Sequence, residues 1–392
     1  MAYLLVKVKI NSLVEGGTLR VLAVTPSYPR FQGDYHGRFI QDMYTRLSGY
    51  VDIQVLAPRS RSSQRTNGVL RFPYMPTQRL ELIAERTMKD APLSHISQLP
   101  LYMTSAYIHM SQIEADIVHA HWATPMGYLA SINQTPYILT CHGSDCSLPL
   151  SNPLFRPFTR RALGKASKIV AVSEYVKQLA MKLGAPREKV TVNYLGVDTQ
   201  KFTPPNNQLK LREAFDIPSG GTVIGSLGRL VRSKRVHDLL RAADMNREKL
   251  DAFIVIGGDG PEYHSLKEMA KRMELDNVYF TGFVEDPVSF HQMCDVYVLS
   301  SEREGLSTSL QEAMACGCTP VAVNGVGCPE VVSDGINGFL YDTGNVEELA
   351  KCILKASEQG FSGKARETII EKFNLDVNAL KYLEIYSEIL EK

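Results

Sequence analysis

The chain has 392 residues, of which 44% are hydrophobic and 22% are charged, and its formal net charge is +1. This length exceeds what one hydrophobic core usually supports, and the composition excludes an intrinsically disordered chain. No apolar run approaches the ~18 residues of a membrane span, and the first residues lack the basic lead of a signal peptide, so the sequence predicts a cytoplasmic protein.

The first half of the chain alternates short apolar, β-branched runs with segments of helical period, which predicts a parallel sheet covered by helices. Residues 1–18 form an N-terminal extension to which the sequence assigns no role. A first Rossmann-like domain is expected at residues 19–199. Its predicted strands lie at residues 19–25, 51–57, 117–119, 137–140, 169–173 and 190–193.

Proline, asparagine and glycine clusters interrupt this pattern, and we place an interdomain linker at residues 200–220. A second Rossmann-like domain is expected at residues 221–375. Residues 376–392 have apolar side chains near helical spacing, which predicts an amphipathic helix that packs back on the first domain. The predicted fold class is therefore α/β with two doubly wound sheets. The strands of the second sheet are expected at residues 222–227, 253–257, 278–281, 296–300 and 320–323.

Charge is distributed unevenly along the chain. Residues 1–200 contain 22 Lys and Arg against 13 Asp and Glu, whereas residues 201–392 contain 21 against 29. Basic clusters at residues 59–71 and 156–168 suit contact with an anionic membrane surface or a phosphorylated acceptor. The alternative is that these side chains form ordinary solvated faces. Nucleic acid is not an expected partner, because no base-reading module accompanies the charge.

Seven cysteines, an odd number scattered through a chain of this size, indicate reduced and mostly buried thiols rather than a disulfide framework. Metal ligation is disfavoured, because no second pair of cysteines stands at ligand spacing. We therefore expect no metal and no other cofactor. The cysteines nearest to a metal-binding arrangement are Cys141, Cys146, Cys316 and Cys318.

Two stretches of the first half carry candidate binding groups. The loop at residues 29–39 follows a strand and precedes a helix, so its glycines can let backbone amides approach a phosphate. These glycines are Gly37 and, less centrally, Gly33. His142 follows another strand, at the edge where such a sheet opens to its ligand, although a structural histidine is the alternative. His119 and His121 are interpreted as structural or acceptor-facing rather than catalytic.

Two cations, Arg229 and Lys234, follow the first strand of the second domain at a strand-to-helix turn. They can neutralise a diphosphate and stabilise it as a leaving group. The alternative is an ordinary surface arginine and lysine.

The strongest signal is the run at residues 300–317, in which a strand ends in two serines and a Glu-Gly turn opens a helix. Eight helical residues rise about 12 Å, so Glu304 and Glu312 can hold the sugar and ribose hydroxyls of one elongated ligand. The alternative is a helix with two solvated glutamates. Backbone amides at the helix N-terminus can bind a diphosphate between the two carboxylates. The residues that carry these amides are Gly305, Leu306 and Ser307.

This run resembles the signature of the family 4 retaining glycosyltransferases, in which two glutamates eight residues apart precede Ala-Met-Ala-x-Gly. The Gly-Arg-Leu-x-x-x-Lys stretch that ends at Lys234 is also similar, and the resemblance extends from about residue 19 to the end. It implies the GT-B architecture, in which two Rossmann-like domains face each other across a cleft. It also implies that Glu304 lies by the donor sugar, Glu312 binds the ribose and His142 reaches the transferred sugar. Loops that line the nucleotide in this family correspond to those with Gly228, Gly258, Phe283 and Val284.

The resemblance implies sugar transfer from a nucleoside-diphosphate donor to an acceptor hydroxyl, with retention of configuration and without a metal. A glycan or lipid-linked acceptor is expected, in glycan, glycolipid or cell-surface polysaccharide synthesis and with peripheral contact at the cytoplasmic face of a membrane. Two alternatives stay open: another nucleotide-sugar enzyme, such as an epimerase, and a non-catalytic protein that binds nucleotide sugars. A Rossmann oxidoreductase is disfavoured, because no Gly-x-Gly-x-x-Gly follows the first strand.

Overall fold

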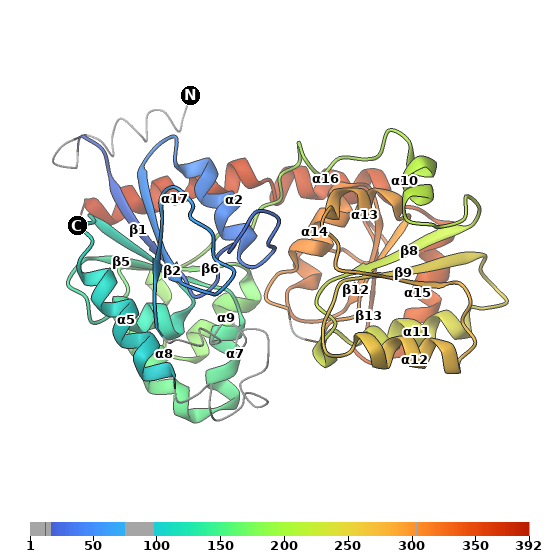
Figure 1. The fold of residues 1–392 in the computed structure, drawn as a ribbon, viewed down its shortest axis with the longest axis horizontal. Helices are drawn as coiled ribbons and strands as arrows, with labels where there is room; N and C mark the ends of the chain where they lie inside the picture. The colour runs from blue at the N-terminus through green and yellow to red at the C-terminus, as the bar shows by residue number, and fades with distance from the viewer. Residues whose placement is uncertain (1–11, 13–16, 75–97, 303, 392) are drawn as a thin grey trace. The chain divides into compact units, whose positions relative to one another are not determined.

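The computed structural model describes residues 12, 17–74, 98–302 and 304–391. The extension expected at residues 1–18 therefore lies almost entirely outside the described residues. The chain divides into two compact units, drawn in Figure 1. The first unit comprises Met1–Tyr194 and Asp376–Lys392, and the second comprises Leu195–Leu375.

The first unit is built on a parallel sheet. Its strands are β1 (Arg20–Val24), β2 (Asp52–Pro58), β3 (Val69–Phe72), β4 (Ile117–His121), β5 (Tyr137–Cys141), β6 (Lys168–Ala171) and β7 (Val190–Val192). They pair in parallel in the order β3-β2-β1-β4-β5-β6-β7. Strands β4 and β5 are buried along their whole length, as expected where helices cover both faces of a sheet. The edge strand β3 is an addition to the strands that the sequence predicts.

Helices of the first unit come from both ends of the chain. They are α2 (Arg38–Leu47), α5 (Leu99–Ser111), α6 (Tyr128–Ala130), α7 (Ser144–Ser151), α8 (Arg156–Lys165), α9 (Glu174–Lys182) and α17 (Leu375–Leu390). The C-terminal α17, red in Figure 1, is tied to this unit by two ion pairs. Arg46 Nε lies 2.6 Å from Asp376 Oδ1, and Lys168 Nζ lies 2.7 Å from Glu388 Oε2. Among the described helices, none combines the length and apolarity needed to cross a bilayer.

The second unit repeats the architecture with a smaller sheet. Its strands are β8 (Thr222–Leu227), β9 (Ala252–Gly257), β10 (Val278–Gly282), β11 (Val296–Leu299), β12 (Thr319–Val323) and β13 (Phe339–Tyr341). They pair in parallel in the order β10-β9-β8-β11-β12-β13. The accompanying helices are α10 (Gln208–Ala214), α11 (Val236–Met245), α12 (Tyr263–Arg272), α13 (Pro287–Met293), α14 (Thr308–Ala315), α15 (Val346–Glu358) and α16 (Ser362–Lys372).

The segment expected to be a linker, residues 200–220, contains helix α10 and is grouped with the second unit. Arg212 on this helix is buried, and its guanidinium lies 2.5 Å from Asp295 Oδ2. The same guanidinium donates to the carbonyls of Met293 and Gly221 at 3.2 Å each. These bonds fix α10 to the second unit, because removing one partner would leave a buried charge uncompensated.

Candidate functional site

Each sheet has one point where the strand order reverses, and the loops that leave neighbouring strands diverge there. In the first unit this point lies between β1 and β4, and in the second it lies between β8 and β11. Ligands of open α/β sheets bind beyond the carboxyl ends of the strands at such points. The loops that follow these four strands are therefore the candidate binding loops of the two units.

In the second unit, the loops after β8 and β11 line a small hollow. Gly228, Arg229 and Lys234 come from the first loop, and Ser300 and Ser301 come from the second. Ser301 is 1% exposed, and its hydroxyl has no hydrogen-bond partner among the described residues. The structure thus brings three predicted donor-site residues together and adds Ser301. The only sequence signal for Ser301 is its place directly after a buried strand.

Lys234 and Glu304 form an ion pair at this point of the second unit. The Lys234 ammonium donates a hydrogen bond to Glu304 Oε1, and the two side chains are 30% and 16% exposed. Ser300 Oγ donates to the Lys234 carbonyl at 2.7 Å, and the Glu302 amide donates to the Ser233 carbonyl at 3.0 Å. The β8 and β11 loops are therefore tied together, and they present a cation beside a carboxylate.

Helix α14 begins later than expected from the sequence. Ser307 is its N-cap, and the Ser307 side chain accepts a hydrogen bond from the Leu310 amide at 3.3 Å. The predicted amides of residues 305–307 consequently lie in the turn before the helix rather than in its first turn. The prediction that a helical rise of about 12 Å separates Glu304 from Glu312 is also wrong, because only the residues from Thr308 onward are helical.

Glu312 lies on α14, and its Oε2 is 3.5 Å from Nε2 of His291, a fully buried residue of α13. Among the described residues, no ion pair or hydrogen bond joins Glu312 to Lys234 or Glu304. The two glutamates of the signature therefore have different neighbours: Glu304 borders a lysine, and Glu312 borders an imidazole.

Glycines bring the ends of β8, β9 and β10 close together. The Gly258 amide donates to the Gly282 carbonyl at 2.7 Å, and the Gly228 amide donates to the Gly257 carbonyl at 3.1 Å. A Cβ on Gly258 would collide with the Gly228 carbonyl, and Gly258 has a φ of 118°. Phe283, which is 47% exposed, and the half-buried Val284 follow β10. Gly258 is thus required by the close approach of the two loops, whereas a Cβ on Gly228 would have no neighbour within 4 Å.

We expect Gly258→Ala to destabilise the second unit by roughly 1–3 kcal/mol, because alanine is strained at this φ and its methyl group would push the Gly228 loop away. The matched control is Gly220→Ala, since a Cβ there has no neighbour within 4 Å. Thermal unfolding of both variants checks the prediction. Equal melting temperatures for the two would contradict it.

In the first unit, the loop between β1 and α2 is organised around Asp34, which is 4% exposed. Its carboxylate accepts from the Arg30 amide at 2.9 Å, from Arg30 Nε at 2.6 Å and from the His36 amide at 3.2 Å. Gly37 has a φ of 66°, and a Cβ there would collide with the Ser27 carbonyl, whereas Gly33 has open space around it. Gly37 is therefore needed by the packing of this loop. No motif in the sequence predicts this role of Asp34.

Asp34 gives the first unit a pH-dependent contribution to stability. Burial is the largest influence and by itself raises the pKa of Asp34, but the hydrogen bonds from His36 and Arg30 together outweigh it, so the pKa lies below its ordinary value. A lowered carboxyl pKa stabilises the folded state above the unfolded pKa of about 3.9, and this stabilisation is lost as the pH falls below that value.

We therefore expect the stability difference between wild type and Asp34→Asn to be largest above about pH 5 and to shrink as the pH falls through about 3.9. Trp122 is the single tryptophan of the chain and belongs to the first unit, so its fluorescence follows the unfolding of this unit. A difference that stays constant with pH would contradict the assignment.

His142 follows β5 in a turn that Asp145 holds. The buried Asp145 carboxylate accepts hydrogen bonds from the backbone amides of Ala123 at 2.8 Å, His142 at 3.1 Å and Gly143 at 2.9 Å. Gly143 has a φ of 110°, which side chains rarely adopt. The half-buried His142 ring is thus positioned by its own backbone turn, and no motif in the sequence predicts this role of Asp145.

His119 in the middle of β4 and His121 at its end are both buried. His119 Nδ1 is 2.8 Å from Tyr386 Oη of α17, and its Nε2 is 2.8 Å from Thr140 Oγ1. His121 stacks between His119 and His142, with ring centroids 4.4 Å and 5.3 Å away. Both histidines therefore belong to the packed interior of the first unit.

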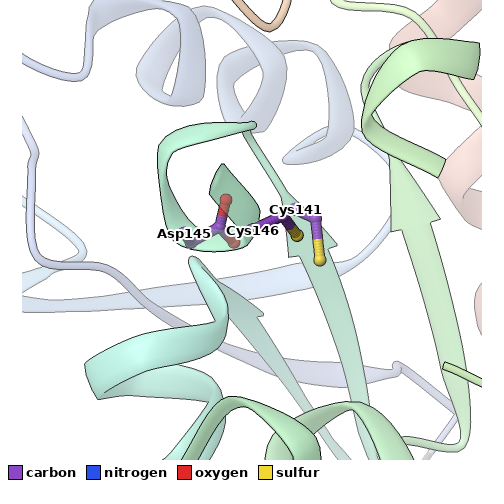
Figure 2. Close-up of side chains that lie close together, drawn as sticks. All are labelled: Cys141, Asp145 and Cys146. Carbon is purple, nitrogen blue, oxygen red and sulfur yellow. The ribbon is translucent and has the colours of Figure 1, made fainter. Parts of the chain in front are cut away.

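Cys141, Asp145 and Cys146 form a buried cluster at the end of β5 and the start of α7, and their ligand atoms all lie within 4.8 Å of one another (Figure 2). All seven cysteines are free and buried. The hydrogen bond that the Cys141 thiol donates to Cys146, together with burial, raises the pKa of Cys141, which disfavours the thiolate that a metal requires. Three backbone amides already occupy the Asp145 carboxylate. The cluster therefore acts as a structural support for the His142 turn.

The chain matches two family models, one for each half. Residues 37–201 match Glycosyltransferase Family 4, and residues 207–374 match Glycosyl transferases group 1. N-acetyl-alpha-D-glucosaminyl L-malate synthase of Bacillus anthracis is 26% identical over 311 residues, which are 75% of this chain and 81% of that protein. The 2-deoxystreptamine glucosyltransferase of Streptomyces kanamyceticus is 29% identical over 306 residues, which are 71% of this chain and 79% of that protein.

A comparison with solved structures supports the assignment of the fold. The crystal structure of Anabaena HepE in complex with UDP and glucose matches with a TM-score of 0.75 at 20% identity, over 94% of this chain and 100% of that one. The two family models together extend across both units. The chain therefore belongs to the group 1, family 4 glycosyltransferases and has their GT-B fold.

Proposed function

We propose that this glycosyltransferase moves a sugar from a nucleoside-diphosphate donor to an acceptor hydroxyl, with retention of configuration and without a metal. The observation that carries the proposal is the Lys234–Glu304 pair beside Arg229, at the point of the second sheet where the strand order reverses. Fixed cations at the carboxyl end of parallel strands suit a diphosphate.

Each charged group has a task in this proposal. Arg229 and Lys234 stabilise the negative charge that develops on the departing diphosphate, which is the task that a metal ion performs in other enzymes. The Glu304 carboxylate accepts hydrogen bonds from sugar hydroxyls, and Glu312 accepts them from the ribose. The loops with Gly228, Gly258, Phe283 and Val284 line the nucleotide, and the turn at Gly305, Leu306 and Ser307 offers backbone amides to the diphosphate.

We propose that configuration is retained because the acceptor hydroxyl attacks the donor sugar on the same face from which the leaving group departs. The departing phosphate oxygen takes the proton of the acceptor hydroxyl while the new glycosidic bond forms on that same face. No protein nucleophile is needed. His142 donates a hydrogen bond to a ligand oxygen, and the loop at Gly37 lets backbone amides approach a ligand phosphate.

Thermal unfolding with UDP-, GDP-, ADP-, dTDP- and CDP-sugars in the presence of EDTA tests the donor assignment. One nucleotide class should raise the melting temperature in wild type but not in Glu312→Gln or Lys234→Ala. Product analysis then separates the alternatives: an epimerase would return an altered donor, and a non-catalytic protein would leave the donor intact. Absence of a shift with every donor would refute the proposal.

We further propose a peripheral contact with an anionic membrane that presents a lipid-linked or glycan acceptor. Leu154 and Phe158 are 70% and 37% exposed, close in sequence to the exposed basic residues Arg160 and Lys165 of α8. Leu154 lies in the turn before α8 and Phe158 lies on α8, and exposed apolar and basic side chains close together along the chain suit such a surface. Co-sedimentation with phosphatidylglycerol vesicles, lost on Leu154→Ser together with Phe158→Ser, is the expected result. Equal binding to phosphatidylcholine vesicles would contradict it.

A further inference from the structure

A buried chain of hydrogen bonds leads from α2 to His142. Tyr44 Oη on α2 lies 2.6 Å from Nε2 of His121, and His121 Nδ1 lies 3.0 Å from Nε2 of His142. Tyr44 and His121 are 3% and 1% exposed. His121 therefore contacts Tyr44 through Nε2 and His142 through Nδ1, and His142 contacts His121 through Nε2.

The side chains in this series of hydrogen bonds, Tyr44, His121 and His142, are all uncharged. Burial lowers the pKa of His121 and of His142, so both imidazoles are uncharged near neutral pH. Burial also raises the pKa of Tyr44 well above its ordinary value, so the phenol keeps its proton. A neutral imidazole has one N–H donor and one acceptor nitrogen. The direction of one hydrogen bond consequently fixes the direction of the next.

The Tyr44 hydroxyl decides that direction. Within the described part of the chain, its only hydrogen-bond partner is His121 Nε2. If Tyr44 donates, His121 carries its proton on Nδ1 and donates to His142 Nε2, so that the His142 proton lies on Nδ1. The opposite direction would leave the phenol proton buried without an acceptor, which is costly.

The hydrogen-bond series ends at Nδ1 of His142, a donor that makes no hydrogen bond within the described residues. Nδ1 of His142 is inaccessible to solvent and has no hydrogen-bond partner among the residues that the structure describes. The His142 ring centroid lies 4.3 Å from that of Trp122 and 5.2 Å from that of Phe39, so aromatic rings flank it. Buried donors without a partner are rare in folded proteins, and such a donor indicates an acceptor supplied by a ligand.

We propose that Tyr44 and His121 are positioning residues that hold His142 in the Nδ1–H tautomer, so that His142 presents a fixed hydrogen-bond donor to a sugar hydroxyl or phosphate oxygen of the substrate. This inference rests on the proposed function for the identity of the ligand. The tautomer itself rests only on the hydrogen bonds of the first unit.

Long-range proton–nitrogen NMR of histidine-labelled protein, with His142 assigned from the spectrum of His142→Asn, measures the tautomer. Wild type should show His142 protonated on Nδ1. Tyr44→Phe and His121→Leu should both shift the population toward Nε2–H. The matched control is Tyr386→Phe, which removes a buried hydroxyl from the neighbouring His119 and leaves the chain to His142 intact.

Turnover is measured on the same proteins. Tyr44→Phe should lower kcat by roughly 10- to 100-fold, the range for partners that orient a functional imidazole, whereas Tyr386→Phe should leave kcat within about twofold. The double variant Tyr44→Phe with His121→Leu should lose no more than His121→Leu alone, because both act through one chain.

Three results would overturn the inference: an Nε2–H tautomer of His142 in wild type, an unchanged tautomer in Tyr44→Phe, or a changed tautomer with unchanged kcat. If wild type transfers no sugar from any donor, the proposed function fails. The NMR measurement still decides the tautomer in that case, so the two failures are distinguishable.

Discussion

Lys234→Ala is expected to lower kcat/KM by roughly 10²- to 10³-fold, the usual cost of removing one preorganised donor from a site where charge develops. Lys234 lies in the hollow between the β8 and β11 loops beside Arg229, and its ammonium is held by Glu304. Alanine removes both the charge and the hydrogen bond. The measurement is the initial rate with the donor that thermal unfolding selects, with Lys210→Ala as the control, because Lys210 is an exposed residue of α10 outside this hollow.

A double variant separates two roles for this lysine. If Lys234 acts on the diphosphate, Lys234→Ala combined with Glu304→Gln is less active than Glu304→Gln alone, since of the two cations in the hollow only Arg229 remains. If Lys234 serves only to neutralise Glu304, the double variant is as active as Glu304→Gln alone. Equal activity of these two proteins would therefore count against the proposed role.

Asp145→Ala is expected to reduce the free energy of unfolding of the first unit by about 2–4 kcal/mol, because it leaves buried backbone amides without an acceptor. The amides of Ala123, His142 and Gly143 all donate to this carboxylate. The turn that positions His142 should loosen as well, so sugar transfer should fall together with stability. Denaturant unfolding followed through the fluorescence of Trp122 measures the change.

Asn152→Ala is the control for this prediction. The Asn152 side chain also accepts a backbone hydrogen bond, from the Leu154 amide at 3.1 Å, but that bond is exposed and water can replace it. We expect its loss to cost less than about 1 kcal/mol. If Asp145→Ala and Asn152→Ala destabilise the first unit equally, Asp145 does not have the organising role assigned to it.

The sequence reveals the layout of the strands because most of them are continuous apolar runs between turn residues. Strands β4 and β5 are buried at every position, and such runs are the signal that parallel strands leave. The two missed strands, β3 and β13, are short edge strands of four and three residues. β3 mixes exposed with buried positions, so it carries little of that signal.

The start of α14 shows where spacing alone fails. The separation of Glu304 and Glu312 fits a helix, but the Ser307 side chain bonds the Leu310 amide and starts the helix at Thr308. A capping serine inside the motif is visible in the sequence. Whether it caps depends on the backbone angles of the turn before it, which the spacing of two glutamates does not report.

Partners distant in the chain account for other contacts that the sequence did not predict. Lys234 and Glu304 are each recognisable from their motifs, but their hydrogen bond joins residues 70 positions apart. Tyr44 and His121 are 77 positions apart, and neither has a motif that indicates the contact. Such pairs follow from the order of strands in the sheet, and a single sequence gives that order only after the fold is known.

The anomeric configuration of the first product tests the central proposal most directly. The donor that thermal unfolding selects is incubated with the protein in the presence of EDTA, and proton NMR follows the anomeric signal before mutarotation. The proposal predicts a product with the configuration of the donor, formed without a metal and formed roughly 10²- to 10³-fold more slowly by Lys234→Ala. A product of inverted configuration, or a reaction that EDTA stops, would contradict it.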